Sequence, residues 1–217
     1  RSEFQRDYDR LIFSAPFRRL QNKTQVFPLP GSVFVHNRLT HSLEVASVGR
    51  SLGDDVAKAL LERHPELQDS FLPEIGSIVS AACLAHDLGN PPFGHSGEKA
   101  ISTFFSEGKG VRLKEKQPNG EQLSPMEWED LTHFEGNANA FRILTHQFEG
   151  RRKGGFVLTY TTLASIVKYP FSSSLAGTKS KFGFFVSEEE SFQKIATELG
   201  LTLLNEHPLK YARHPLV

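Results

Sequence analysis

The sequence predicts a mainly α-helical fold, formed by a single domain of 217 residues. Apolar residues recur at three- and four-residue steps over long stretches, which is the spacing of a helix face. Stretches of β-branched or aromatic residues that could form strands are short. A hydrophobic content of 38% and a charged content of 23% are typical of a globular domain that buries a core.

The periodic stretches predict four helices. Residues 40–61 form an amphipathic helix whose apolar stripe consists of Val45, Val48, Leu52, Val56 and Leu60. A second helix over 74–87 has a stripe of Ile75, Ile78, Val79 and Ala82. The sequence Gly89-Asn90-Pro91-Pro92 stops this helix. A third helix begins near Ser96, and a fourth follows Gly136.

The remaining segments are predicted as loops or short strands. Residues 108–125 are polar and contain Gly and Pro, so they form a loop or an insertion. Residues 150–155 form a short basic turn, and residues 170–180 form another loop. The short stretches 33–35 and 182–186 are the candidate strands.

Charge and composition exclude several classes of protein. The 25 Lys and Arg balance the 25 Asp and Glu, which argues against a generally basic nucleic-acid binder. One cysteine excludes a disulfide framework and fits a reducing, cytoplasmic setting. No apolar run approaches the ~18 residues of a membrane span, and no signal peptide is recognisable, so we expect no membrane partner.

Two histidines lie at the ends of predicted apolar stripes. His41 lies four residues before Val45, and His86 lies four residues after Ala82 with Asp87 beside it. Both imidazoles are therefore expected to point toward the core, where a charged carboxylate needs a partner. Either histidine alone would be read as a hydrogen-bonded core residue. Together with the carboxylate, they indicate a site for a divalent cation such as Mn²⁺, Fe²⁺, Zn²⁺ or Mg²⁺.

His95 and Glu98 form a second candidate group. They are three residues apart at the start of the third predicted helix, so their side chains share a face. They follow the His-Asp pair across the Pro91-Pro92 turn. A histidine oriented by a carboxylate suits proton transfer, and the alternative is a solvated His–Glu pair on the helix surface.

Five segments around these residues carry a family resemblance. They are FQRDYDRLIFSAPFRRLQNKTQVFP (4–28), NRLTHSLEVASVGRSLG (37–53), AHDLGNPPFGHSGEKAI (85–101), FEGNANAFRIL (134–144) and KYP (168–170). Together with His41 and His86-Asp87, they resemble the deoxyguanosine triphosphate triphosphohydrolase (dGTPase) branch of the HD-domain phosphohydrolases. The resemblance covers nearly the whole chain and implies the N-terminal part of a helical HD-domain phosphohydrolase fold over residues 1–217.

The resemblance also implies an activity and a cofactor. Members of this branch hydrolyse a deoxynucleoside triphosphate (dNTP) at the α-phosphorus and release deoxynucleoside and tripolyphosphate, so dGTP is the expected substrate. His41, His86 and Asp87 would be three of four ligands of a divalent metal, with Mn²⁺ or Mg²⁺ preferred and Fe²⁺, Co²⁺ or Zn²⁺ as alternatives. The resemblance further implies a homo-oligomer.

Other roles follow from the resemblance position by position. His95 would be the catalytic acid or the group that activates the nucleophile, and Glu98 would orient it. Arg38 resembles an arginine that grips substrate phosphates, a task that suits its guanidinium fork, although it could be a surface residue. Gln25 and Val26 would lie beside the sugar, where a close-packed amide would exclude ribonucleotides. Further triphosphate contacts would be Asn137, Lys168, Tyr169 and Lys181, and nearby candidates for a supporting role are His133 and Glu135.

The fourth metal ligand is missing from the pattern. The family's last aspartate lies well downstream of residues 168–170, and nothing like it precedes Val217. The carboxylates that could replace it are Glu129, Asp130, Glu135 and Glu188–Glu190. None of them has the apolar flanks of a buried ligand helix. Because the chain starts at Arg1 and stops at the apolar Leu216-Val217, we expect it to be truncated at both ends; the alternative is an incomplete metal site.

Three other functions remain open. The chain could be a catalytically silent regulatory module that binds dNTPs, or another HD-domain nucleotide phosphohydrolase. Single-stranded nucleic-acid binding through residues 151–153 and 109–116 is the weakest alternative, because the net charge is zero.

Overall fold

In the computed structural model, which describes residues 1–23, 37–118, 120–150, 155–176 and 181–217, the longest element is helix α3 (Arg38–Arg63). Its start is fixed by a capping box: the side chain of Asn37 accepts the backbone N–H of Thr40, and the Thr40 hydroxyl accepts the backbone N–H of Asn37. The cap places Arg38 and His41 in the first turn of α3.

Helices make up most of the described chain. Two short helices and a 3₁₀ turn precede α3: α1 (Glu3–Ile12), α2 (Ala15–Arg19) and η1 (Leu20–Asn22). The helices that follow it are α4 (Ile75–Ala85), α5 (His95–Ser106), α6 (Pro125–Thr132), α7 (Gly136–Thr145), α8 (Tyr160–Ile166) and α9 (Glu189–Glu198). The 3₁₀ turns between them are η2 (Pro65–Leu67), η3 (Leu72–Glu74), η4 (Lys109–Lys114), η5 (Ser173–Leu175) and η7 (Val186–Glu188). A small antiparallel hairpin of β1 (Leu203–Asn205) and β2 (Lys210–Tyr211) comes last.

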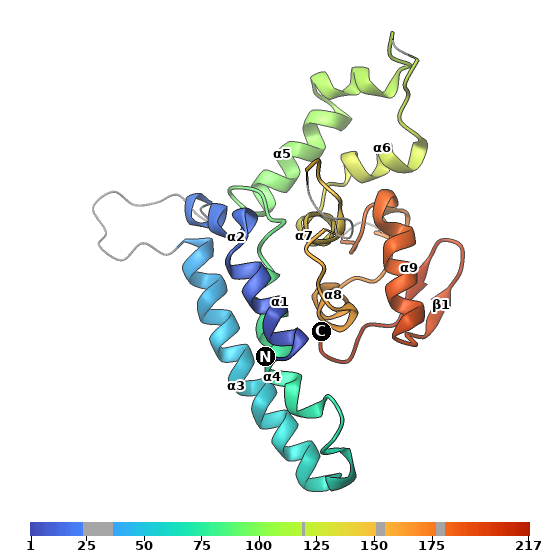
Figure 1. Cartoon of the computed structure of the whole chain (residues 1–217). Coiled ribbons are helices and arrows are strands. Elements are labelled where there is room, and N and C mark those ends of the chain that lie inside the picture. Colours follow the sequence, from blue (N-terminus) through green and yellow to red (C-terminus); the bar gives the residue numbers. More distant parts are fainter. Residues whose placement is uncertain (24–36, 119, 151–154, 177–180) are drawn as a thin grey trace, which may run out of the picture.

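Helix α4 is the centre of the molecule. Its residues are small or apolar and are buried on nearly all sides, as expected of a helix enclosed by others. It packs along α3, crosses α1 and contacts α8 (Figure 1). The main core continues from α4 through Phe141 of α7 to Phe184 and Phe192 of the C-terminal part. The C-terminal end of α4, where His86 and Asp87 follow, is therefore held by helices from both halves of the chain.

The packed face of α3 is not the predicted one. Val48, Leu52 and Val56 are 59%, 61% and 50% exposed, so the apolar stripe faces outward in this chain. The buried face instead consists of Arg38, Ser42, Ala46, Gly49, Gly53 and Ala57. Small residues let the backbones of α3 and α4 approach closely: a Cβ on Gly53 would lie 2.8 Å from the Cα of Gly76. The prediction that His41 points into the core from the apolar stripe was therefore wrong, and His41 is half-buried beside the packed face.

The four predicted helices are confirmed, with bounds close to those expected, as α3, α4, α5 and α7. Residues 108–118 and 120–124 form the predicted loop, which contains the 3₁₀ turn η4, and Pro125 already begins α6. The predicted strand over 182–186 is wrong, because these residues form a loop and the start of η7. The predicted strand at 33–35 lies outside the described residues. The β1–β2 hairpin was not predicted.

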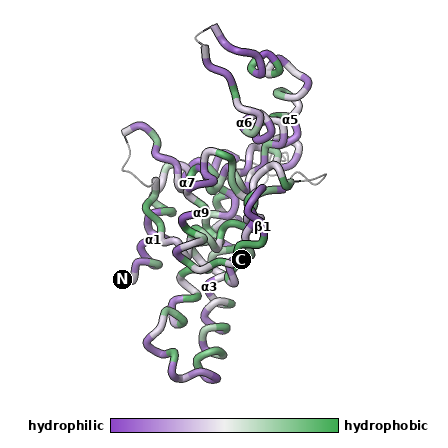
Figure 2. The backbone as a smooth tube through the Cα atoms, turned by 90° about the vertical axis from the view of Figure 1, so that its right-hand side faces the viewer, coloured by the Kyte–Doolittle hydropathy of each residue, from purple (hydrophilic) through white to green (hydrophobic). Residues whose placement is uncertain are grey.

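Helices α5 and α6 project from the main body with η4 between them (Figure 2). Helix α5 has no fully buried residue. Its N-terminus, by contrast, lies beside α7 and carries His95 and Glu98. In the part of the chain that the structure describes, no helix is both long and apolar enough to cross a membrane.

Candidate metal centre and catalytic site

His41, His86 and Asp87 meet where the start of α3 lies beside the end of α4. One ligand atom from each lies within 4.8 Å of the others, and the two imidazole rings are 5.2 Å apart between centroids. Ligand atoms bound to one ion at about 2.1 Å lie roughly 3–4 Å apart, so only a small closure separates this cluster from metal-binding geometry. The three predicted ligands are thus brought together by the fold.

Hydrogen bonds orient these side chains as ligands. The Nδ1 of His86 lies 2.6 Å from the carbonyl oxygen of Cys83, so Nδ1–H donates and the lone pair of Nε2 is left for a cation. Nε2 lies 3.5 Å from Oδ1 of Asp87. The Nδ2 of Asn90 donates to the same Oδ1 at 2.5 Å. Two imidazoles and a carboxylate fit a borderline divalent cation such as Mn²⁺ or Zn²⁺.

Arg38 is part of this cluster. Its side chain is buried, and Nη1 lies 2.8 Å from Oδ1 of Asp87. Its Nε–H is buried and has no hydrogen-bond partner among the described residues. A buried donor without a partner is costly, so this site favours an anion that could accept a hydrogen bond from Nε–H. The alternative interpretation of Arg38 as a surface residue is wrong.

The turn between the metal cluster and His95 is pressed against α7. A Cβ on Gly89 would lie 2.0 Å from the carbonyl oxygen of Gly136, so only glycine permits this approach. The carbonyl of Gly89 also accepts a hydrogen bond from Nδ2 of Asn139 at 2.8 Å. Gly94, at φ 56°, then turns the chain into α5 next to the guanidinium of Arg38. The turn therefore sets the position of His95 relative to the cluster.

His95 and Glu98 form the predicted pair. The Nδ1 of His95 lies 2.8 Å from Oε2 of Glu98, and the two side chains are 86% and 13% exposed. The other carboxylate oxygen, Oε1, accepts the backbone N–H of Gly136 at 2.9 Å. Glu98 is thus anchored to α7, whereas the Nε2 side of His95 faces solvent. The alternative of a freely solvated pair does not fit the anchoring of Glu98.

Burial by itself would raise the pKa of Glu98, but its hydrogen bonds outweigh this. Those from His95 and Gly136, together with the nearby Lys181 ammonium, hold the pKa of Glu98 below its usual value. Glu98 therefore stays ionised at neutral pH and can orient the imidazole of His95.

Two of the predicted substrate-binding residues lie beside this pair. The Nζ of Lys181 is 3.5 Å from Oε2 of Glu98 and 2.8 Å from Oε1 of Glu135. The Nδ2 of Asn137 donates to the same Oε1 at 2.7 Å. Asn137 and Lys181, which are 42 and 86 residues downstream of His95 in sequence, are thus brought to the part of the site where Glu98 is anchored.

The other predicted substrate contacts are placed differently. Lys168 lies over the ring of Tyr169 at 5.6 Å, and Arg213 approaches the same ring from another segment. The backbone of Tyr169 lies against Gly183, which places Lys168 and Tyr169 close to the segment that carries Lys181. Gln25 and Val26 lie outside the described residues. His133 bonds to Glu129 of its own helix, so it does not support the site directly.

Lys23 was not predicted as a site residue. Its Nζ donates to the carbonyls of Leu88 and Asn90 at 3.2 and 3.1 Å, and so fastens the turn that follows Asp87. Burial and the nearby charges of Arg38 and Arg19 lower the pKa of Lys23, although Asp87 opposes this. The available signal was its position at the start of the segment KTQVF, two residues before Gln25.

The carboxylates considered as a fourth ligand serve elsewhere. Asp130 accepts the backbone N–H of Val186 at 2.7 Å, Glu188 pairs with Arg142 at 2.6 Å, and Glu135 caps α7. All three are buried, although their sequence flanks gave no sign of it. Among the described residues, none joins His41, His86 and Asp87 within ligand distance.

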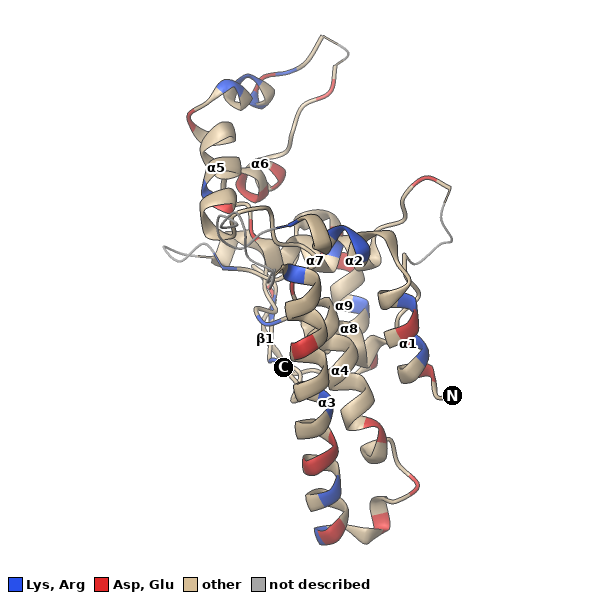
Figure 3. Ribbon diagram, turned by 90° about the vertical axis from the view of Figure 1, so that its left-hand side faces the viewer, with Lys and Arg blue, Asp and Glu red and all other residues tan. Residues whose placement is uncertain are grey.

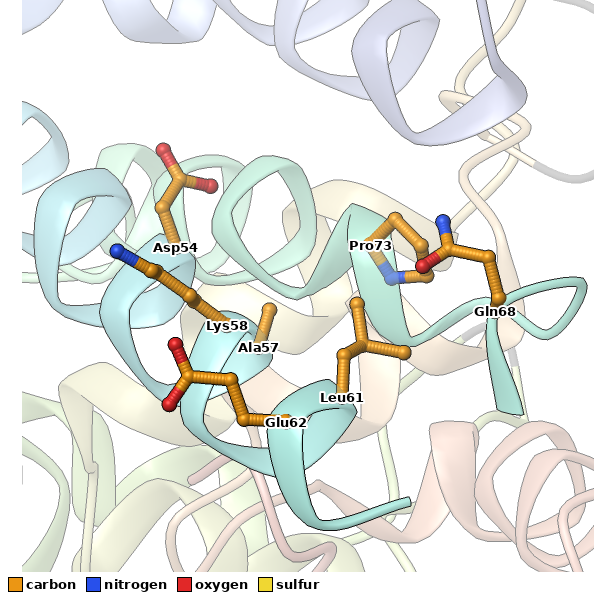
Figure 4. Close-up of a pocket in the computed structure, with 7 residues that line it drawn as sticks. All are labelled: Asp54, Ala57, Lys58, Leu61, Glu62, Gln68 and Pro73. Carbon is orange, nitrogen blue, oxygen red and sulfur yellow. The ribbon is translucent and has the colours of Figure 1, made fainter. Parts of the chain in front are cut away.

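Of two cavities among the described residues, one lies away from the cluster and the other borders the turn that follows Asp87. One of about 520 Å³, at the far end of α3, is lined by residues that include Asp54, Lys58 and Glu62 (Figure 4). Asp54 is 13 residues beyond His41 on one helix, which is about 20 Å. A larger cavity of about 780 Å³ lies between α1, α2 and the end of α7 and includes Arg19 and Lys23 in its lining. Basic residues gather on α2 near this cavity (Figure 3).

Of the two segments considered for nucleic-acid binding, only residues 109–116 are described. Lys114 lies 5.6 Å from the ring of Trp128 in the projecting arm, and residues 151–153 lie outside the described residues.

Comparisons with known proteins agree with this geometry. A family model described as HD domain matches residues 38–169, which include Arg38, His41 and the pair His86-Asp87. A "Deoxyguanosinetriphosphate triphosphohydrolase-like protein" of Pseudomonas aeruginosa strain LESB58 is 48% identical over 225 aligned positions, covering 100% of this chain and 48% of the relative. A protein of the same description from Synechocystis sp. is 44% identical, covering 100% and 50%.

A "Deoxyguanosinetriphosphate triphosphohydrolase" of Yersinia enterocolitica is 36% identical, covering 96% of this chain and 46% of the relative. The chain thus spans about half the length of the curated relatives it matches. The family match covers more than half of the chain and includes the cluster of His41, His86 and Asp87, and the helical fold agrees with it. The chain therefore belongs to the HD domain family.

Proposed function

We propose that this chain carries the metal centre and the catalytic pair of a dNTP triphosphohydrolase, acting on dGTP and releasing deoxyguanosine and tripolyphosphate. The observation that carries the proposal is the cluster of His41, His86 and Asp87, whose ligand atoms lie within 4.8 Å of one another. The names of the relatives, dGTPase or dGTPase-like, support the substrate class.

A divalent ion at the cluster, Mn²⁺ or Mg²⁺ by preference, would polarise a phosphate oxygen and favour ionisation of a water molecule. The residues of the chain provide the remaining functions. Glu98 holds Nδ1 of His95, so that Nε2 is the atom that takes or gives a proton at the reacting phosphate. The exposed position of the His95 side chain leaves room for a substrate beside the cluster.

Binding of the triphosphate would rely on cations that the neutral chain concentrates locally. Arg38 has an unpaired buried Nε–H next to Asp87, and Lys181 lies beside Glu98. Lys168, Tyr169 and Asn137 would add contacts along the phosphates, while Gln25 and Val26 would exclude a ribose. We further propose that the protein acts as a cytoplasmic homo-oligomer.

A product assay tests this function. The full-length protein is incubated with each of the four dNTPs and with GTP, with Mn²⁺ or with EDTA, and the products are separated by ion-exchange chromatography. We expect tripolyphosphate and deoxynucleoside in equal amounts, fastest with dGTP and absent with EDTA. Release of diphosphate or orthophosphate as the only phosphate product would contradict the proposal and indicate another HD-domain phosphohydrolase.

One observation favours a second candidate, a regulatory module that binds dNTPs without turnover. Within the described residues the cluster has three ligands, and a metal centre with three protein ligands binds the ion less tightly. In the same assay this candidate predicts saturable dGTP binding by calorimetry with no product after prolonged incubation.

A further inference from the structure

Glu135 is a fully buried carboxylate at the start of α7, and its partners identify what it does. Its Oε2 accepts the backbone N–H groups of Asn137 at 2.5 Å and of Ala138 at 3.2 Å, which caps the helix. Its Oε1 accepts Nδ2 of Asn137 at 2.7 Å and Nζ of Lys181 at 2.8 Å. One buried charge therefore fixes both side chains that lie next to the His95–Glu98 pair.

The same group is linked to the catalytic pair. Gly136, the residue after Glu135, donates its N–H to Glu98, and Lys181 lies between Glu98 and Glu135 at 3.5 and 2.8 Å. A displacement of Glu135 would therefore move Lys181 and one anchor of Glu98 together.

Lys181 and Asn137 retain hydrogens that Glu135 does not use. An ammonium has three N–H donors, and the two carboxylates near Lys181 use at most two. The amide of Asn137 has two, and Glu135 accepts one. Each side chain can therefore donate to an anion while it remains bound to Glu135.

We propose that Glu135 is a positioning residue that holds Asn137 and Lys181 in place as donors for a phosphate group beside His95. Naming that group as part of a triphosphate rests on the proposed function, whereas the holding of the two side chains does not. Burial alone would lower the pKa of Lys181, but Glu135 and Glu98 outweigh it and raise that pKa, so Lys181 stays charged in its partly buried position.

The first test needs no substrate. In Glu135→Gln the single side-chain oxygen is needed to cap α7, which turns the amide NH₂ toward Lys181 and removes its partner. Labelling with a trace of acetic anhydride at pH 9, followed by mass spectrometry, reports the reactivity of each lysine. We expect labelling of Lys181 to rise about tenfold, as for the loss of one charge-assisted hydrogen bond, while the exposed Lys99 is unchanged. Equal labelling of Lys181 in both proteins would overturn the proposal.

A second variant covers the case in which Glu135→Gln does not fold, as judged by circular dichroism. Glu135→Asp keeps the charge and the cap but shortens the reach, and should also release Lys181 to labelling. Unchanged labelling of Lys181 in a folded Glu135→Asp protein would contradict the proposal that the carboxylate at position 135 holds Lys181.

Binding of inorganic tripolyphosphate, measured by calorimetry, is the second readout. We expect Glu135→Gln to weaken this binding about tenfold. Adding Lys181→Met should cause no further loss, because both changes remove the same contact between Lys181 and the anion. Full additivity would contradict the coupling. With dGTP, Glu135→Gln should raise KM more than it lowers kcat. If no dNTP is hydrolysed but the labelling result holds, the proposed function fails and the positioning role stands.

Discussion

Arg38 combines two tasks that usually belong to different residues. Its Nη1 is bound to Asp87, a candidate ligand, while its Nε–H points into the same buried region without a partner among the described atoms. A guanidinium has five N–H donors in a rigid plane, so it can donate to a carboxylate from one edge and to a phosphate from another. Arg38 therefore ties the cluster to a candidate site for a phosphate.

Two histidine variants should separate metal binding from catalysis. His86→Ala removes a ligand atom, so both metal content and turnover should be lost. His95→Ala leaves the cluster intact, so turnover should fall by about 10²–10⁴ while metal content is retained. Metal content is measured by atomic emission after gel filtration, with His64→Ala, an exposed histidine that bonds Glu66, as the control. Equal metal loss in the two variants would show that His95 has been assigned wrongly.

Asp130 should make stability depend on pH. Burial raises the pKa of Asp130 to about 6, and the neighbouring Glu188 adds to this, while hydrogen bonds from Ser173 and Val186 oppose it. Its pKa in the unfolded chain is about 3.8, so between pH 4 and 6 the folded state binds more protons than the unfolded state. This contribution to stability is present at low pH and is lost as pH rises through 6.

The variant Asp130→Asn removes that dependence. Relative to the unchanged protein, its free energy of unfolding should gain on the order of 2 kcal/mol between pH 4 and pH 7. Urea unfolding followed by circular dichroism at several pH values measures the difference, with Asp69→Asn at an exposed position as the control. A difference that stays constant with pH would contradict the raised pKa.

At the scale of elements, the interface between α3 and α4 shows which features a sequence reveals. The four-residue spacing of Val48, Leu52 and Val56 predicts a helix correctly, because this is the period of any helix face, whether the face is buried or exposed. It does not tell which face meets α4. That face is chosen by Gly49 and Gly53, whose lack of a side chain lets α4 approach, and small residues have little weight in an apolar pattern.

Spacing and helical periodicity pointed to the histidines and to the carboxylates beside them, whereas Arg38, Asn137 and Lys181 came from the family resemblance alone. His86, Asp87, His95 and Glu98 lie within 13 residues, and the periodicity of the helices and the family resemblance locate them. Glu135 was considered as a supporting residue and as a replacement for the fourth ligand, but not as a partner of Lys181, which is 46 residues away. The burial of Asp130 and Glu188 was missed for the same reason, since Val186 and Arg142 come from other segments.

Gly53→Ala tests the small-residue face of α3. Alanine favours a helix interior by about 1 kcal/mol, but its Cβ would lie 2.8 Å from the Cα and 3.0 Å from the N of Gly76, which are backbone atoms and cannot rotate away. We expect a net loss of about 1–3 kcal/mol in the free energy of unfolding, measured in urea. Val56→Ala, on the exposed face of the same helix, should change it by less than about 0.5 kcal/mol. The reverse order would mean that the apolar stripe is the packed face.

At the scale of the whole molecule, contacts between segments that are far apart in sequence hold the body together. Asp7 of α1 is buried and accepts both the N–H and the hydroxyl of Thr159, at 2.9 and 2.6 Å, and so caps α8 from a distance of 152 residues in sequence. Helix α4 lies between these two helices. The end of α4 carries His86 and Asp87, so the metal cluster is supported by both halves of the chain.

The projecting arm lacks this support, and its local stability should be lower. Helix α5 has no fully buried residue, and η4 and α6 contribute only Gly110 and Asp130 to the interior. Because segments with few buried contacts open more often, amides in residues 99–118 should exchange with deuterium within minutes, while those of α4 and α8 stay protected far longer. Mass spectrometry of peptides from these segments measures the difference. Adding Mn²⁺ should protect the end of α4 and the turn at 88–94 but leave 107–118 unchanged, since the candidate ligands lie only in the body. Exchange of α5 as slow as that of α4 would contradict an independent arm.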